Sequence, residues 1–257
     1  MFYWIFIFLL FGFIVILILT GFFFLANAIK KKMKNMAVLG FGVIAIPIGF
    51  IGNFFFNLGH IFQEYFVCIG FVSAVVFTNM TFYKGKMKKA NILLILVIIL
   101  GIIQIVLFHM FPETKLKRNF YYYLVVSLDL PYVLLVYNWF AYSFYSAYKR
   151  LKDQDIEPWI KARYKMLAIS SFFMSFHTIP EFFQPENVLW GDPSQPLSLL
   201  IYGILAVMVI IYGIIFSLSW FMPKRLKRYF NRNYQREIDK EYTEDELMNL
   251  IKNQIKK

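Results

Sequence analysis

The chain has 257 residues, of which 60% are hydrophobic, 21% aromatic and only 16% charged, and its mean hydropathy is +0.59. This apolar share is higher than in soluble domains, so the expected solvent is a lipid bilayer. The formal net charge of +12 does not indicate a nucleic-acid partner, because the Lys and Arg residues cluster in short runs beside long apolar segments and not along one polar face.

Seven stretches of the sequence are apolar over the length of about 20 residues that a membrane-spanning helix needs. They predict an all-α fold, a polytopic bundle of seven transmembrane helices in residues 1–222 that crosses the cell membrane several times. We find no convincing internal repeat of the kind that marks many transporters. The predicted helices cover residues 2–28, 36–58, 62–83, 90–111, 120–147, 164–183 and 196–222.

The first stretch has one property of a secretory signal peptide, because Ala26-Asn27-Ala28 has the small residues of a cleavage site. Its apolar part is longer than in a signal peptide, and its start lacks positive charge. The lysines of residues 30–34 then follow it as a stop-transfer pattern. We therefore interpret residues 2–28 as a membrane helix that the protein retains.

The basic residues predict the orientation of the bundle. When the loops are assigned to alternate sides, nearly all Lys and Arg residues fall on one side, in segments 30–34, 84–89, 149–165 and 224–257. Cytoplasmic loops carry such an excess, so we expect an external N-terminus and a cytoplasmic C-terminus. Three external exceptions are too few to reverse this assignment: Lys115, Lys117 and Arg118.

Polar side chains inside the predicted helices are the main functional signal, because hydrocarbon tolerates them only when they are paired. Several of them lie four residues apart, a spacing that places two side chains on one face of a helix. All of these pairs fall toward the outer half of the predicted bundle. The pairs are Asn53 with Asn57, His60 with Glu64, and His177 with Glu181.

Asp129 is the deepest of the ionisable residues. It follows Phe120, at the start of the fifth helix, by nine residues, which is roughly 13 Å at the helical rise and close to the bilayer midplane. Pro131 has no amide hydrogen, so we expect a kink there that exposes backbone polarity to the bundle interior. We expect a second bend at Pro180 in the sixth helix.

These residues lead to the hypothesis of an outward-facing polar cavity that binds a ligand. The histidines and glutamates near helix ends have a plainer alternative as hydrated interfacial residues. Asp129 has one as a protonated acid that bonds a carbonyl freed by Pro131, and His177 as an interhelical hydrogen-bond partner. We predict no catalytic residues, metal ligands or cofactor. The hypothetical lining is Asn53, Asn57, His60, Glu64, Gln104, Asp129, His177 and Glu181.

The last part of the chain, residues 223–257, is predicted to be a basic amphipathic cytoplasmic tail. Its first residues suit a helix on anionic lipid headgroups of the inner leaflet. Thr243 precedes Glu246 by three residues, the spacing of a capping box. Apolar residues then recur on one helical face, which predicts a short helix over about 244–256.

Seven helices with an external N-terminus and a cytoplasmic tail resemble seven-transmembrane receptor and sensor modules, including the seven-helix input regions of prokaryotic sensor kinases. The resemblance covers residues 1–222 and is architectural, without a diagnostic motif. It implies a receptor-like module that binds a small ligand or lipid. Since no kinase or cyclase domain is recognised, the signal would pass to a separate cytoplasmic signalling protein.

Two alternatives stay open. In a proton-coupled small-molecule transporter, Asp129 would titrate during transport, although the inner half of the bundle lacks polar residues. In a zinc-dependent intramembrane lipid hydrolase, three histidines would hold the metal, although His60, His109 and His177 fall on different helices. A retinal protein is excluded because residues 196–222 contain no lysine for the Schiff base.

Overall fold

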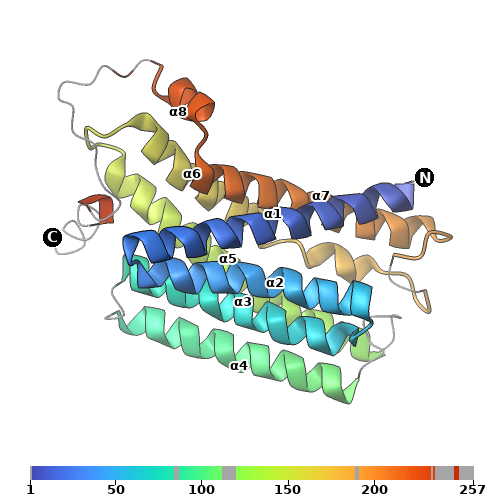
Figure 1. The fold of residues 1–257 in the computed structure, drawn as a ribbon. Coiled ribbons are helices and arrows are strands. Elements are labelled where there is room, and N and C mark those ends of the chain that lie inside the picture. The colour runs from blue at the N-terminus through green and yellow to red at the C-terminus, as the bar shows by residue number, and fades with distance from the viewer. Residues whose placement is uncertain are drawn as a thin grey trace.

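The computed structural model describes residues 2–83, 87–111, 120–188, 191–232, 234 and 246–248. Within these ranges the regular elements are helices (Figure 1). They are α1 (Phe2–Lys31), α2 (Lys34–Phe56), α3 (Gly59–Phe82), α4 (Lys88–Met110), α5 (Phe120–Leu151), α6 (Pro158–Met174), the 3-10 helix η1 (Ile179–Phe183), α7 (Pro196–Phe221) and α8 (Lys224–Phe230).

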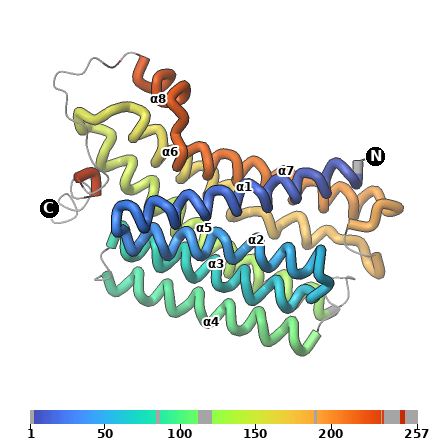
Figure 2. The backbone as a smooth tube through the Cα atoms, in the orientation of Figure 1, coloured from blue at the N-terminus to red at the C-terminus, as the bar shows by residue number. Residues whose placement is uncertain are grey.

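The long helices form an antiparallel bundle in which each helix packs against its neighbours in sequence. α7 also returns beside α1, and this contact closes the bundle (Figure 2). α4 lies at the edge and, within the described chain, packs only against α3 and α5. Helix α5 stays helical through Pro131, the expected site of a kink.

Six of the helices, α1 to α5 and α7, are long and apolar enough to cross a membrane. Large apolar side chains also cover the outside of the bundle, as on α4, where Ile92, Ile95 and Ile102 are each more than half exposed. Exposed apolar surface of this extent requires an apolar environment. The protein is therefore embedded in a membrane through an all-helical bundle.

The segment predicted as the sixth membrane helix differs from the expectation of residues 164–183. Helix α6 begins earlier, with Pro158 in its first turn, a position at which proline needs no amide hydrogen. It ends at Met174, where Ser175 Oγ donates to the Phe172 carbonyl at 2.6 Å and His177 Nδ1 lies 2.9 Å from the Met174 carbonyl. Such side-chain bonds compete with the helical ladder, and the chain continues as a turn into η1.

Helices α2 and α3 approach each other closely because glycines stand at their contact. A Cβ atom added to Gly49 would lie 2.8 Å from the Phe66 Cβ and 2.9 Å from the Gln63 carbonyl oxygen. Gly42 faces Ser73 in the same way. Small residues allow such close backbone packing in membrane helices, and this contact fixes one wall of the site described below.

The Lys and Arg residues of the described chain gather at one end of the bundle, which we call the basic end. It comprises the last turns of α1 and α5, the first turns of α2 and α4, the first half of α6, and α8. There α8 packs on α6, and the Trp159 amide donates to Asn231 Oδ1 at 3.2 Å. Leu247 and Met248 are buried in the core that includes this end.

Some predicted features lie outside the described residues. They are Lys84 and Lys86, the external exceptions Lys115, Lys117 and Arg118, the capping residue Thr243, and residues 244–245 and 249–256 of the predicted tail helix.

At the opposite end, the connection between η1 and α7 is held by polar side chains. Gln184 Nε2 and the Gly191 amide both donate to Ser198 Oγ, at 3.0 and 2.9 Å. Asp192 accepts hydrogen bonds from the hydroxyl and from the backbone amide of Ser194. These bonds, the hydroxyl's more than the amide's, hold the pKa of Asp192 below its usual value. The bonds to Ser198 therefore join Gln184 and Gly191 to the first turn of α7.

Candidate functional site

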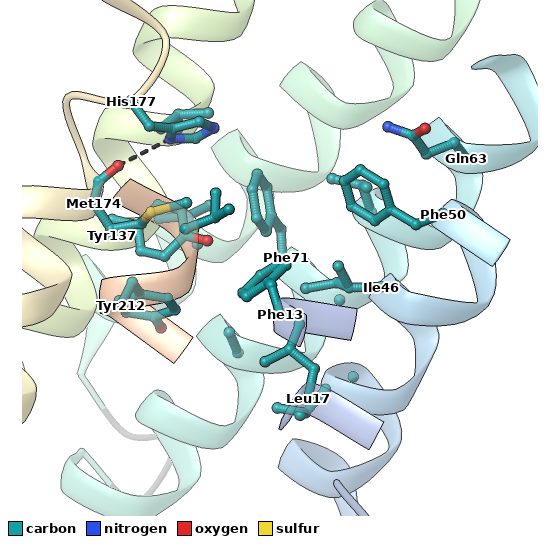
Figure 3. A pocket seen from close by; sticks show the side chains of 18 of the residues that line it. Phe13, Leu17, Ile46, Phe50, Gln63, Phe71, Tyr137, Met174, His177 and Tyr212 are labelled. Atoms are coloured by element: carbon teal, nitrogen blue, oxygen red, sulfur yellow. Dashed lines mark hydrogen bonds between the residues drawn. The ribbon is translucent and has the colours of Figure 1, made fainter. Parts of the chain in front are cut away.

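A cavity of ≈ 210 Å³ lies at the centre of the bundle, between α1, α2, α3, α5 and α7 and beside the turn after α6 (Figure 3). Most of its lining is apolar or aromatic, with Phe13, Leu17 and Phe71 among the labelled side chains. Its ionisable and amide residues, apart from tyrosines, belong to the half of the bundle away from the basic end. They are His60, Gln63, Glu64, Asp129, His177 and Glu181.

Asn53 on α2 holds two side chains that α3 contributes to this polar end, His60 and Gln63. Its Nδ2 donates to Gln63 Oε1 at 2.8 Å and lies 3.2 Å from His60 Nδ1. Because an amide nitrogen can only donate, His60 Nδ1 is the acceptor, and the neutral ring then carries its proton on Nε2. Asn53 therefore links α2 to α3 and sets the tautomer of a cavity residue.

Asp129 is buried, with 8% of its surface exposed, and it joins three parts of the bundle. Gln104 Nε2 on α4 lies 3.5 Å from Oδ1, and Thr178 Oγ1 in the turn after α6 donates to Oδ2 at 3.3 Å. Both partners are fully or almost fully buried. Buried polar groups are normally hydrogen-bonded, and here both carboxyl oxygens have a donor. The bond from Thr178 ties the turn after α6 to α5.

His177 contacts both the turn and the aromatic wall of the cavity. A carbonyl only accepts, so the bond to Met174 places the proton of the neutral ring on Nδ1 and makes Nε2 an acceptor. The ring meets Tyr137 edge-on, with centroids 6.0 Å apart. Tyr137 in turn packs edge-on against Phe71 and Tyr212 (Figure 3). A continuous aromatic contact thus runs from the polar end to the apolar part.

The two glutamates of the cavity are also buried, each with 7% of its surface exposed. Tyr122 Oη on α5 donates to the Glu181 backbone carbonyl at 2.9 Å and so holds η1 against α5. With Asp129, the described lining has carboxyl groups from three elements and no Lys or Arg. This end therefore favours a cation or a hydrogen-bond donor over an anion.

The structure distributes the predicted site residues over three positions. The lining includes His60, Glu64, Asp129, His177 and Glu181, whereas Asn53 and Gln104 stand behind it and bond to lining residues. Asn57 lies elsewhere: it is exposed and ends α2 with a left-handed φ of 51°. It therefore does not share a helical face with Asn53, and His177 and Glu181 are brought together by a turn and η1 and not by one helix.

Sequence reasoning missed Gln63 and Thr178. Gln63 had a weak signal, because it adjoins Glu64 in the same polar cluster. Thr178 had none, since hydroxyl residues are common in membrane helices and its bond to Asp129 depends on the turn. The large apolar part of the lining was also not foreseen, because hydrophobic residues that face lipid and those that face a cavity look alike in sequence.

Within the described ranges, no group of three or more His, Cys, Asp or Glu side chains is arranged to hold a metal ion. The lining of the site combines hydrogen-bonding groups at one end with aromatic and aliphatic surface at the other. Comparisons with protein-family models, curated proteins and solved structures gave no match to this chain.

Proposed function

We propose that the protein is a receptor-like or sensor module of the cell membrane, which binds a small amphiphilic ligand in the central cavity and relays binding to a cytoplasmic protein. The observation that carries the proposal is the division of one cavity into a polar end and an apolar part. Ligand sites typically combine a mainly apolar lining with a few placed polar groups.

The proposed topology has seven crossings of the membrane. Six are the long apolar helices α1 to α5 and α7, and α6 and η1 together form the seventh. The excess of Lys and Arg at the basic end supports a cytoplasmic location for that end, and we infer an external N-terminus from it. The polar end of the cavity then lies toward the external surface. Anionic lipid headgroups would surround the basic loops and α8.

The lining defines the chemistry of the ligand. Three carboxyl groups and no lining Lys or Arg favour a cationic or hydrogen-bond-donating head, and the aromatic wall favours an apolar body. The cavity volume of ≈ 210 Å³ lies below the roughly 300–1,000 Å³ of typical ligand pockets. We therefore favour a compact amphiphile over a two-chain phospholipid.

The turn after α6 provides the proposed relay. Thr178 ties this turn to Asp129 on α5, and α6 runs from the turn to Pro158 at the basic end. A ligand that contacts His177 and Glu181 differently in two arrangements would shift their populations. The output surface would be the segment 148–165, which joins α5 to α6.

The proposal predicts that hexyltrimethylammonium, a small cationic amphiphile, raises the thermal midpoint of the purified protein in detergent. Binding to the folded state alone stabilises that state. Hexanesulfonate, the anionic counterpart, should have no such effect. Ala74→Phe places a ring in the cavity and should abolish the shift, whereas Ile69→Phe, on the same helix at a side chain that is 37% exposed and outside the lining, should retain it.

Equal shifts with the cationic and anionic amphiphiles, or an unchanged shift in Ala74→Phe, would contradict binding in this cavity. The midpoint of each variant without amphiphile is the control for folding.

A proton-coupled transporter is the second candidate, and the burial of Asp129 within the bundle favours it. An intramembrane carboxyl group beside a cavity is suited to bind and release a proton. A transporter of this kind requires a group at position 129 that can carry a proton, whereas a sensor does not.

A further inference from the structure

A second cavity, of ≈ 740 Å³, lies at the basic end of the bundle. The ends of α1 and α7, the starts of α2 and α6, and Lys227 of α8 form its walls, together with Met248 of the tail. Among the described residues, none lines both this cavity and the central one. We call it the basic-end cavity, and it requires an explanation of its own.

Positive charge predominates in its lining. Lys31, Arg163 and Lys227 come from three different helices, and Glu157 is the one carboxylate among the described lining residues. The Trp159 indole donates a hydrogen bond to that carboxylate, so Glu157 is engaged within the wall. Three cations against one carboxylate favour an anionic occupant.

Aromatic rings position two of the cations. The Arg163 guanidinium is buried, with 4% of the residue exposed, and lies 4.7 Å from the centroid of the Trp220 ring. The Lys227 ammonium lies 4.0 Å from the centroid of the Trp159 ring. A ring face attracts a cation without accepting conventional hydrogen bonds, so Lys227 keeps N–H donors for a ligand.

Trp220 adds a donor that the described chain does not satisfy. Its Nε1–H is buried and has no hydrogen-bond acceptor within the described residues. An unsatisfied buried donor lowers stability.

We propose that the basic-end cavity binds the phosphate group of an anionic ligand whose organic part packs on the neighbouring rings. Several donors from separate helices suit the tetrahedral oxygens of phosphate better than the planar pair of a carboxylate. Phe23 and Phe77 supply apolar lining for the attached group. The phosphate comes either from a lipid headgroup or from a soluble compound. The inference stands apart from the ligand proposed for the central cavity.

The test compares two double variants that lose the same charge. Lys31→Gln with Lys227→Gln removes two lining cations, whereas Lys30→Gln with Arg228→Gln removes their exposed neighbours on α1 and α8, which do not line the cavity. The probes are dihexanoyl phosphatidic acid and inorganic phosphate, and the readout is tryptophan fluorescence in detergent, since Trp159 and Trp220 line the cavity.

We expect a saturable fluorescence change with dihexanoyl phosphatidic acid. The half-saturating concentration should rise by about tenfold or more in the lining variant, as expected for lost charge-assisted hydrogen bonds, and stay unchanged in its control. A much weaker effect of inorganic phosphate identifies a lipid headgroup, and equal affinities identify a soluble phosphate. Arg163→Gln provides a second lining variant, and unchanged thermal midpoints establish that each variant folds.

Equal affinities of the lining and control variants would overturn the proposal. So would the absence of saturation with both probes, or binding of hexanoate, a carboxylate amphiphile, as tight as that of dihexanoyl phosphatidic acid.

Discussion

At the scale of single residues, Asp129 links α5 to two other parts of the bundle, because α4 and the turn after α6 both bond to it. We expect Asp129→Asn to keep a nearly unchanged thermal midpoint. The new amide oxygen still accepts from Thr178, and Gln104 Oε1, buried without a partner in the described chain, can accept from the new amide nitrogen. Asp129→Leu leaves two buried donors unsatisfied, at a cost of about 1 to 3 kcal/mol each. Equal midpoints of the two variants in detergent would contradict this role.

The same Asn variant separates the sensor from the transporter, because an amide cannot carry a proton between the two sides of the membrane. Proton-driven solute uptake by proteoliposomes that is lost in Asp129→Asn would establish the transporter. A sensor has no such uptake, and its cavity should still bind hexyltrimethylammonium in this variant.

The sequence identifies such residues by their chemistry, since an ionisable group in an apolar stretch stands out. It does not reveal how backbone geometry arranges them. Asn57 has the spacing of a partner for Asn53, yet its left-handed conformation ends α2 and leaves it exposed. Thr178 reaches Asp129 only because the chain leaves the helical path after Met174.

At the scale of the helices, the close contact of α2 and α3 depends on Gly49. A methyl group there would lie 2.9 Å from the Gln63 carbonyl oxygen, a backbone atom that cannot rotate away. We therefore expect Gly49→Ala to push the helices apart and to cost about 1 to 3 kcal/mol of stability, seen as a lower thermal midpoint. On α1, Gly12→Ala is the matched control, because its nearest contact is a side-chain atom at 3.5 Å. That variant should be neutral or slightly stabilised by the higher helix propensity of alanine. Similar losses in both variants would be inconsistent with a specific close approach.

Hydropathy alone locates the six helices that are long and apolar enough to cross a membrane, because lipid requires long apolar segments with satisfied backbone groups. It fails for the sixth segment, whose limits are set by local chemistry. Pro158 permits an early start, and the side chains of Ser175 and His177 bond carbonyls at the end. The hydropathy of residues 164–183 contains no information on these hydrogen bonds.

At the scale of the whole molecule, one cavity lies at the centre of the bundle and the other at its basic end, and α6 is one of the helices that reach both. It begins beside Trp159 in the basic-end cavity and ends at Met174 in the central one. A shift of α6 along its axis would therefore change both cavities. If α6 and η1 cross the membrane, as proposed, this arrangement joins the central cavity to the basic end.

This condition is open to a direct test with cysteine labelling in intact cells. In a background without the free Cys68, Lys152→Cys and Gln195→Cys place exposed thiols on the two sides of the α6 and η1 segment. If that segment is a seventh crossing and the basic end is cytoplasmic, a membrane-impermeant maleimide labels position 195 in intact cells and position 152 only after permeabilisation. Labelling of both positions from the outside would mean that α6 and η1 do not cross. Labelling of position 152 alone would reverse the orientation, and the polar end of the central cavity would then face the cytoplasm.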